Sequence, residues 1–194
     1  MAGGRLRVIA GAAGGLRLVA PPGIRPTAGR VREAVFAALG DVSGASVLDL
    51  FAGSGALAIE ALSRGAGRAL LVDRDRDATD AVGENLETTH LAERARVLTR
   101  PVGSVLAVSP PPEAPFDLVC CDPPYEMPAS DLALVLVGLR GPGWLDAEAR
   151  VVVERAARGA ASATEPGWGD GWNVGWERRY GDTLVTVLRP MQDL

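Results

Sequence analysis

The chain has 194 residues, of which 47% are hydrophobic and 23% are charged, and its formal net charge is −4. These values fit one main globular domain and exclude a disordered chain. No apolar run reaches the roughly 18 residues that span a bilayer, and no secretory leader follows Met1, so we expect a cytoplasmic protein. One histidine, His90, and two adjacent cysteines, Cys120 and Cys121, are too few for a zinc site, so we expect no metal.

The basic charge is concentrated at the N-terminal end. Residues 1–40 contain six arginines and a single acidic residue, Glu33, which gives this stretch a charge of +5 and leaves −9 for the rest. Arginine alternates with apolar residues on both sides of a glycine-rich turn, so residues 5–20 are predicted to form a β-hairpin with one basic face. A basic arm on an acidic body favours a polyanionic partner.

A helix is predicted to follow the hairpin. Pro26 and Thr27 supply a start signal, and apolar residues recur at helical spacing as far as Gly40. Arg30 and Arg32 fall outside the apolar stripe. They form either a solvated helix face or a pair that holds substrate phosphates, and the sequence leaves both interpretations open.

A βαβ unit begins at Ser46. The strand 47–51 is followed by a glycine-rich turn, a helix and a second buried strand that ends at Asp73. Gly53 and Asp73 are twenty residues apart, which is the spacing at which an acidic side chain meets a ribose in nucleotide-binding α/β folds. The unit therefore predicts a nucleotide site at the end of its first strand.

Two classes of cofactor compete for this glycine-rich turn. Residues 53–58 satisfy the Gly-x-Gly-x-x-Ala pattern of dinucleotide-binding enzymes. However, Asp49 lies four residues before the first glycine, where its carboxylate would repel a pyrophosphate. S-adenosylmethionine fits better, because it carries an ammonium and a sulfonium for Asp49 and a ribose for Asp73. The remaining alternative is that the glycine-rich turn only packs against the core and that neither aspartate binds a ligand.

The rest of the chain continues the alternation of helices and strands. It predicts an α/β fold with a doubly wound, Rossmann-like and mostly parallel sheet, an antiparallel C-terminal hairpin and an N-terminal β-hairpin extension. Trp168, Trp172 and Trp176 are expected to cover the core rather than to stack on bases. The predicted elements are helices at 75–89, 103–108 and 129–139, strands at 95–98, 116–121 and 150–154, and a hairpin formed by 176–179 and 183–188.

The strand at 116–121 ends in Asp122-Pro123-Pro124-Tyr125. The two prolines fix their own φ angles and push the preceding residues toward extended geometry, so the turn is rigid. A carboxylate, backbone carbonyls and an aromatic ring in a fixed relation suit a flat heterocycle with an exocyclic amino group. The alternative is that the proline pair merely ends a strand.

Ligands of doubly wound sheets collect beyond the C-terminal ends of the strands, where we expect the glycine-rich turn and the Asp122 loop to meet. Methyl transfer fits this pair, because the sulfonium methyl group is already activated and needs only in-line placement. Asp122 and the Pro123 carbonyl would hold the amino hydrogens, and Tyr125 would stack on the base. These three residues form the predicted catalytic set.

The stretch from Asp49 to Gly55, Asp-Leu-Phe-Ala-Gly-Ser-Gly, and the later Asp-Pro-Pro-Tyr resemble the class I S-adenosylmethionine-dependent methyltransferases that modify exocyclic amino groups. Over nearly the full chain, the sequence resembles the RsmD family of 16S rRNA guanine-N2 methyltransferases. The motifs that carry this second resemblance are Arg25-Pro-Thr27, Arg30-Val-Arg-Glu33, Glu60–Ala66 and Gly143-Trp-Leu145.

The family resemblance implies a methyltransferase domain at 23–194, an RNA-binding appendage at 1–22 and S-adenosylmethionine as cofactor. It also implies the guanine(966)-N2 type of reaction on 16S rRNA within the assembled 30S subunit, and we expect a monomer. The cofactor-binding residues expected are Asp49, Phe51, Gly53, Ser54, Gly55, Asp73 and Val102, and the RNA-binding residues expected are Arg5, Arg7, Arg17, Arg25, Arg30 and Arg32.

Two pairs of neighbouring residues depart from the family pattern. Ala28 and Gly29 stand where the family often has Thr-Asp, so any contact made by that aspartate is absent. Arg100 and Pro101 stand where many related enzymes place an acidic residue near the adenine. We therefore expect backbone groups around Val102 to recognise the adenine.

Three other functions remain as alternatives. A DNA adenine-N6 methyltransferase would use the same tetrapeptide, although the chain shows no separate target-recognition domain. A dinucleotide-binding oxidoreductase would need the glycine-rich turn to bind a pyrophosphate. A non-catalytic RNA-binding module would leave Asp49 and Asp122 without a role.

Overall fold

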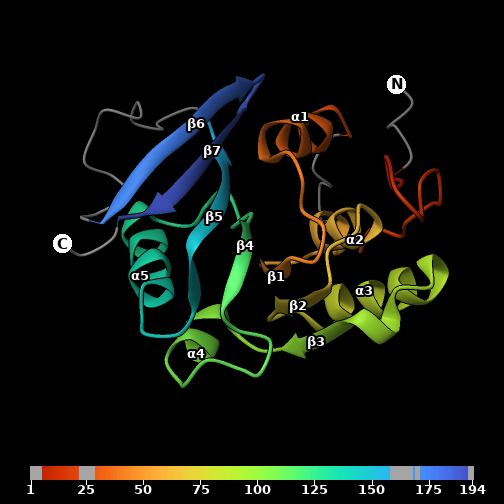
Figure 1. Cartoon of the computed structure of the whole chain (residues 1–194), viewed down its shortest axis with the longest axis horizontal. Coiled ribbons are helices and arrows are strands. Elements are labelled where there is room, and N and C mark those ends of the chain that lie inside the picture. The colour runs from red at the N-terminus through yellow and green to blue at the C-terminus, as the bar shows by residue number, and fades with distance from the viewer. Residues whose placement is uncertain (1–5, 22–28, 158–167, 169–170, 192–194) are drawn as a thin grey trace.

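The computed structural model describes residues 6–21, 29–157, 168 and 171–191 (Figure 1). Its strands are β1 (Ser46–Leu50), β2 (Arg68–Asp73), β3 (Ala95–Thr99), β4 (Phe116–Cys121), β5 (Leu145–Ala156), β6 (Trp172–Tyr180) and β7 (Thr183–Pro190). Its helices are α1 (Gly29–Leu39), α2 (Ala56–Ser63), α3 (Arg76–Thr89), α4 (Val102–Leu106) and α5 (Ala129–Leu139), with a short 3-10 turn, η1 (Ala92–Arg94).

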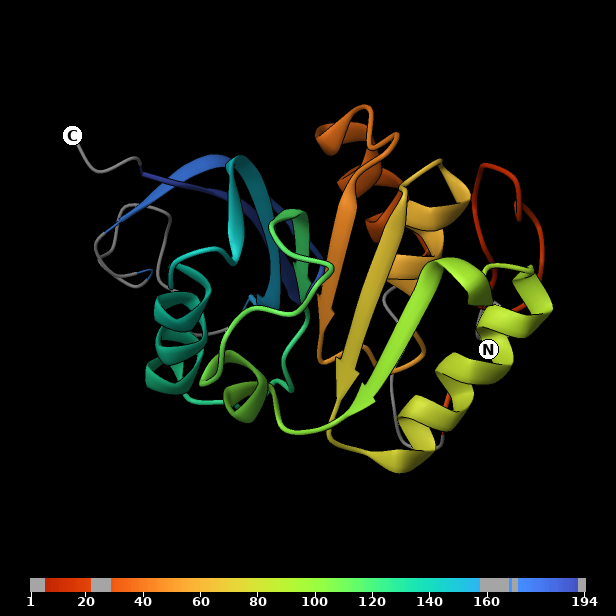
Figure 2. The same cartoon turned by 60° about the horizontal axis from the view of Figure 1, so that its bottom comes forward.

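All seven strands form one sheet in the order β3-β2-β1-β4-β5-β7-β6. The first five strands along the chain pair in parallel, and β7 and β6 complete the sheet as an antiparallel hairpin. Figure 2 shows the C-terminal ends of β1, β2 and β3 together at one edge. The predicted fold class is therefore confirmed. None of the helices within the described part of the chain is long and apolar enough to cross a membrane.

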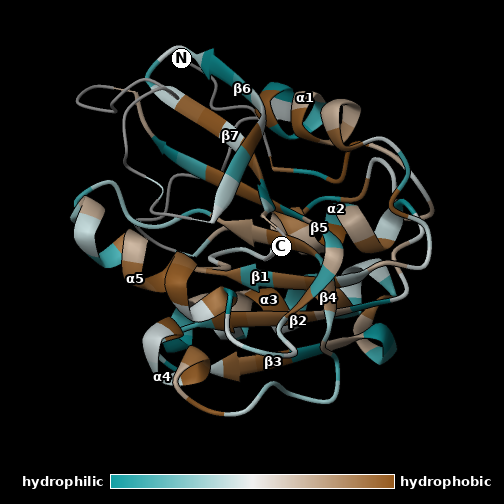
Figure 3. Ribbon diagram, turned by 60° about the vertical axis from the view of Figure 1, so that its left-hand side comes forward, coloured by the Kyte–Doolittle hydropathy of each residue, from teal (hydrophilic) through white to brown (hydrophobic). Residues whose placement is uncertain are grey.

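Two hydrophobic clusters lie on opposite faces of the sheet. Residues of α1, α2 and α3 pack in one cluster, and residues of α4 and α5 pack in the other. All five residues of β1 are buried, which is expected for a parallel strand covered by helices on both faces. Figure 3 shows the hydrophobic residues along β1 and β2 between these helix layers.

The two cysteines at the end of β4 face opposite clusters, as their adjacency on a strand predicts. Cys120 belongs to the cluster under α2, and Cys121 belongs to the cluster under α5. Burial raises the pKa of both thiols. The cysteines therefore act as small core residues rather than as nucleophiles.

The N-terminal segment forms a hairpin with one isolated bridge, between Arg7 and Arg17, rather than two regular strands. The Val8 amide donates to the Leu16 carbonyl over 2.9 Å, and the Leu18 amide donates to the Leu6 carbonyl over 3.0 Å. Val8 and Leu18 are buried while Arg7 and Arg17 are exposed, so the predicted alternation of the two faces is confirmed. Figure 1 shows this hairpin beside α2 and α3.

The strands are incomplete because the hairpin backbone bonds to α2. The fully buried carboxylate of Glu60 accepts hydrogen bonds from the amides of Ile9 (2.7 Å) and Ala10 (3.1 Å). The same carboxylate lies 2.7 Å from the Arg64 Nε. Glu60 thus anchors the hairpin to the core. The Ile9 and Ala10 amides donate to Glu60 and are therefore unavailable for strand pairing.

Two strands begin earlier than predicted. β5 begins at Leu145 instead of 150, and β6 begins at Trp172 instead of 176. The added parts contain exposed residues and, at Gly175, a shift in the β6–β7 register, so their side chains lack a strand-like pattern. Trp168 and Trp172 are buried, as expected for side chains that cover the core.

Replacing Glu60 with alanine is expected to lower the free energy of unfolding by about 3–5 kcal/mol. The substitution removes one partner of a buried ion pair and leaves two backbone amides without their acceptor. Glu60→Gln keeps an acceptor oxygen and should lose less. Chemical denaturation measures both effects.

Glu84 on α3 provides the matched control, because it is an exposed glutamate in a helix. Glu84→Ala should change the free energy of unfolding by less than about 0.5 kcal/mol. Equal losses for Glu60→Ala and Glu84→Ala would contradict the anchoring role of Glu60.

Candidate functional site

The loops that follow β1 and β4 meet at the C-terminal edge of the sheet. β1 lies between β2 and β4, and Leu50 is in register with Val72 on one side and Cys121 on the other. The Ala52 amide donates to the Val72 carbonyl over 3.0 Å, which holds the start of the glycine-rich turn against β2. The predicted convergence of the two loops is confirmed.

The glycine-rich turn depends on backbone conformations that favour glycine. Gly53 and Gly55 have φ values of 54° and 72°, in the left-handed region. A Cβ on Gly55 would lie 3.0 Å from the Leu71 Cδ2 atom, so the helix that Gly55 caps packs closely on β2. Phe51 also has a positive φ, of 61°, which is unusual for an aromatic residue and marks local strain.

Asp73 fixes this turn from the end of β2. One carboxylate oxygen accepts a hydrogen bond from the Gly53 amide over 2.8 Å, and the other accepts one from the Asp75 amide over 3.0 Å. Each oxygen retains a further lone pair. Asp73 therefore connects the turn to the edge where we expect a ribose.

Asp49 is 2% exposed and lies one residue from the end of β1. Its carboxylate accepts a hydrogen bond from the Ala58 amide over 3.1 Å. Burial raises the pKa of Asp49 well above its usual value; the Ala58 bond lowers this pKa, and the nearby charges of Asp122 and Asp73 raise it further. The charges of Asp73 and Asp122 beside Asp49 make this edge electronegative, which suits a cationic ligand and disfavours a pyrophosphate.

The predicted catalytic residues lie on the loop after β4. Asp122 is half-buried at the strand end, Pro123 is buried, and Tyr125 is 48% exposed. The Met127 amide donates to the Pro124 carbonyl over 2.9 Å and closes the loop. An exposed ring on the same short loop as a carboxylate can receive a planar base.

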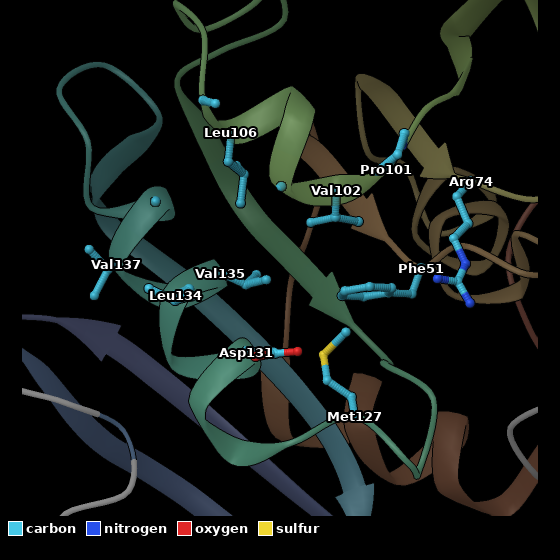
Figure 4. A pocket seen from close by; sticks show the side chains of 13 residues that line it. Phe51, Arg74, Pro101, Val102, Leu106, Met127, Asp131, Leu134, Val135 and Val137 are labelled. Atoms are coloured by element: carbon cyan, nitrogen blue, oxygen red, sulfur yellow. The ribbon is translucent and has the colours of Figure 1, made fainter.

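An apolar pocket of about 500 Å³ opens between α4 and α5 (Figure 4). Of the predicted cofactor residues, Phe51 and Val102 line it, whereas the other five do not: Asp49, Gly53, Ser54, Gly55 and Asp73. In Figure 4, the Phe51 ring extends between Val102 and Met127. The pocket therefore adjoins the carboxylates through Phe51, two residues after Asp49.

Several pocket residues were missed by the sequence reasoning. Arg74 directly follows Asp73, so its place at the pocket could have been predicted from the strand end that identified Asp73. On α5, Leu134 and Val137 are 69% and 64% exposed, and such exposed apolar side chains commonly mark a binding site. The other missed lining residues are Pro101, Gly103, Leu106, Ala107, Met127, Asp131, Val135 and Gly138.

The expected RNA-binding arginines differ in accessibility. Arg7, Arg17 and Arg30 are exposed. Arg32 is 1% exposed and donates to the Arg7 carbonyl over 2.6 Å, so the expectation that it faces a substrate is wrong. Burial lowers the pKa of Arg32, while the charges of Glu60 and Glu154 raise it. Arg5 and Arg25 lie outside the described residues.

His90 lies exposed at the end of α3. It ends α3 in the left-handed conformation, with φ of 58°, so the prediction that it is a surface or cap residue is confirmed. Within the ranges that the structure describes, no group of three or more His, Cys, Asp or Glu side chains is arranged to hold a metal ion.

Comparison with known proteins gives consistent matches over most of the chain. A family model described as Conserved hypothetical protein 95 matches residues 6–189. The ribosomal RNA small subunit methyltransferase D of Escherichia coli is 38% identical over 168 residues, 85% of this chain and 82% of that protein. The protein of the same name from Haemophilus influenzae is 35% identical over 156 residues, 78% and 79% of the two chains.

A solved structure is also similar. The Escherichia coli protein YhhF superposes with a TM-score of 0.82 at 34% sequence identity, and the match covers 98% of this chain and 100% of that chain. The similarity therefore includes the N-terminal hairpin as well as the sheet.

Asp49→Asn is expected to reduce the pH dependence of stability. Because the pKa of Asp49 is raised on folding, its contribution to stability is greatest below the ordinary value of 3.8 and is lost as the pH rises through the folded pKa. Asparagine cannot ionise but still offers an oxygen to the Ala58 amide. Denaturation curves of both proteins between about pH 4 and pH 8 measure the difference.

The variant should gain stability relative to the wild type as the pH rises across that range. If the free energy of unfolding of the two proteins changed with pH in the same way, burial would not raise the pKa of Asp49.

Proposed function

The chain belongs to the RsmD family, and on this premise we propose that it is an S-adenosylmethionine-dependent methyltransferase that modifies the exocyclic N2 of a guanine in 16S rRNA. The observation that carries the proposal is the parallel pairing of β1 with β4, which brings the glycine-rich turn and the Asp122 loop to one edge. The names of the relatives support rRNA as the substrate.

The cofactor would bind across the ends of β1, β2 and β3. The apolar pocket suits the adenine, with Phe51 as one wall and the backbone near Val102 as the edge that recognises it. Asp73 is positioned for the ribose hydroxyls, and Asp49 for the methionine ammonium. Gly53, Ser54 and Gly55 would allow the cofactor to lie close to the backbone.

The bound cofactor would supply an activated methyl group on its sulfonium. The chain's own residues then orient the acceptor. The Asp122 carboxylate and the Pro123 carbonyl would accept the two amino hydrogens and so orient the nitrogen lone pair for the transfer. Tyr125 stacks on the guanine, a contact worth about 1–3 kcal/mol, which offsets part of the cost of extruding the base.

The remaining features follow from an rRNA substrate. We infer that residues 1–22 are an RNA-binding appendage of the domain at 23–194, with Arg7 and Arg17 on its exposed face and Arg30 at the start of α1. We infer that the substrate is rRNA within the assembled 30S subunit, and that the enzyme acts in the cytoplasm as a monomer without a metal.

Asp122→Ala is expected to lower kcat by about 100-fold or more, because the amino group loses its charged acceptor. The affinity for S-adenosylhomocysteine should stay unchanged. The assay uses labelled S-adenosylmethionine and 30S subunits from a strain that lacks the enzyme, followed by mapping of the methylated base. Asp80→Ala on α3 serves as control, since Asp80 is exposed and pairs only with Arg76 at 3.9 Å in the described structure.

Methylation of a base other than guanine, or full activity of Asp122→Ala, would refute the assignment.

Asp73→Ala is expected to weaken S-adenosylhomocysteine binding at least about tenfold, since it removes the expected ribose acceptor and the anchor of the Gly53 amide. Calorimetric titration measures the affinity. In the wild type, S-adenosylhomocysteine should raise Tm whereas NAD should not. Stabilisation by NAD alone would favour an oxidoreductase instead.

A further inference from the structure

The turn between β6 and β7 lies against the catalytic loop. Tyr180 pairs with Thr183 across a two-residue turn formed by Gly181 and Asp182. The Thr183 hydroxyl is 3.1 Å from the Tyr125 hydroxyl, within hydrogen-bond distance. The end of this hairpin is therefore in direct contact with the aromatic residue that is proposed to stack on the target base.

The strand register decides which hairpin side chains share the face of Thr183. Residues that pair across antiparallel strands lie on the same face, and neighbours along a strand alternate between faces. Arg178 pairs with Val185, which is two residues after Thr183, so Arg178 and Thr183 share a face. Arg179 pairs with Leu184 and lies on the opposite face.

The face with Arg178 is the one on which Val185 joins the cluster that includes residues of α1. Val185 belongs to the hydrophobic cluster that contains Val31 and Val35 of this helix. The C-terminal end of α1 lies near the middle of β5, because Arg150 donates to the Leu39 carbonyl. Figure 1 shows α1 beside the end of β6.

Arg178 is exposed and takes part in no hydrogen bond or salt bridge within the described residues. Glu154 on β5 and Arg178 on β6 both pair with Val185 of β7, which lies between them. The charge of Glu154 instead raises the pKa of the buried Arg32. In contrast, Arg179 donates from its Nε to the Gly181 carbonyl over 2.9 Å. The charge of Arg178 is thus available to an anion beside Tyr125.

We propose that the β6–β7 hairpin is a second RNA-contact surface, on which Arg178 binds a backbone phosphate next to the target nucleotide. This inference rests on the proposed function. The occupant is single-stranded RNA, because a base stacked on Tyr125 must leave its helix and brings its flanking phosphates to the hairpin. A diagonal neighbour of Thr183 lies about 7–8 Å away, within the reach of an arginine side chain.

Arg178→Ala tests this surface, with Arg179→Ala as the matched control. Both residues are exposed arginines on the same strand and differ in the face that they occupy. Arg178→Ala should raise KM for 30S subunits about tenfold, which corresponds to the loss of one charge-assisted hydrogen bond. The slope of log KM against log salt concentration should fall by about 0.7–1.

The other readouts separate RNA contact from a structural role. For Arg178→Ala, kcat at saturating subunits, S-adenosylhomocysteine affinity and Tm should equal those of the wild type. Arg178→Lys should recover part of the affinity, because it keeps the charge, and Arg179→Ala should stay within about twofold of the wild type.

Equal KM values and salt slopes for the two alanine variants, with an active wild type, would overturn this inference and leave the proposed function intact. A wild type that methylates no rRNA would instead overturn both.

Discussion

The pairing of β1 with β4 is the constraint on which the site depends. Both strands are buried in a parallel sheet, and such strands require helices on both faces. The chain meets this requirement by placing α2 and α3 on one face and α4 and α5 on the other. As a consequence, β1 and β4 become neighbours although they are far apart in sequence, and the loops that follow them face the same volume of solvent.

The parts of this arrangement that were predictable are those coded by neighbouring residues. Gly53 and Gly55 predict a turn, because glycine readily adopts φ values that other residues avoid. The proline pair after Asp122 predicts a rigid strand end. Alternation within a few residues was enough to assign the buried and exposed faces around Val8 and Leu18. The meeting of the glycine-rich turn and the Asp122 loop then followed from the general behaviour of doubly wound sheets.

The parts that were not predictable depend on distant partners. Arg32 looked like a surface residue, since its helix pattern gives no reason for burial; its environment comes from Arg7, Glu60 and Glu154, which lie elsewhere in the chain. The α5 residues that line the pocket could not be predicted from the sequence for a similar reason. A helix that is apolar on several sides predicts burial, and only the sheet reveals that Leu134 and Val137 stay exposed beside a cavity.

Two energetically unfavourable features of the fold, at Asp49 and Phe51, lie at this same edge of the sheet. Asp49 has a carboxylate whose ionised form is disfavoured by burial and by two further acidic side chains, and Phe51 holds a left-handed conformation that costs about 1–2 kcal/mol. Neither feature helps the chain to fold. A cation that binds beside Asp49 would offset the first cost, so the folded state should gain stability when such a ligand is bound. The same two residues therefore make the unliganded protein less stable, at the edge where the proposed function places the cofactor.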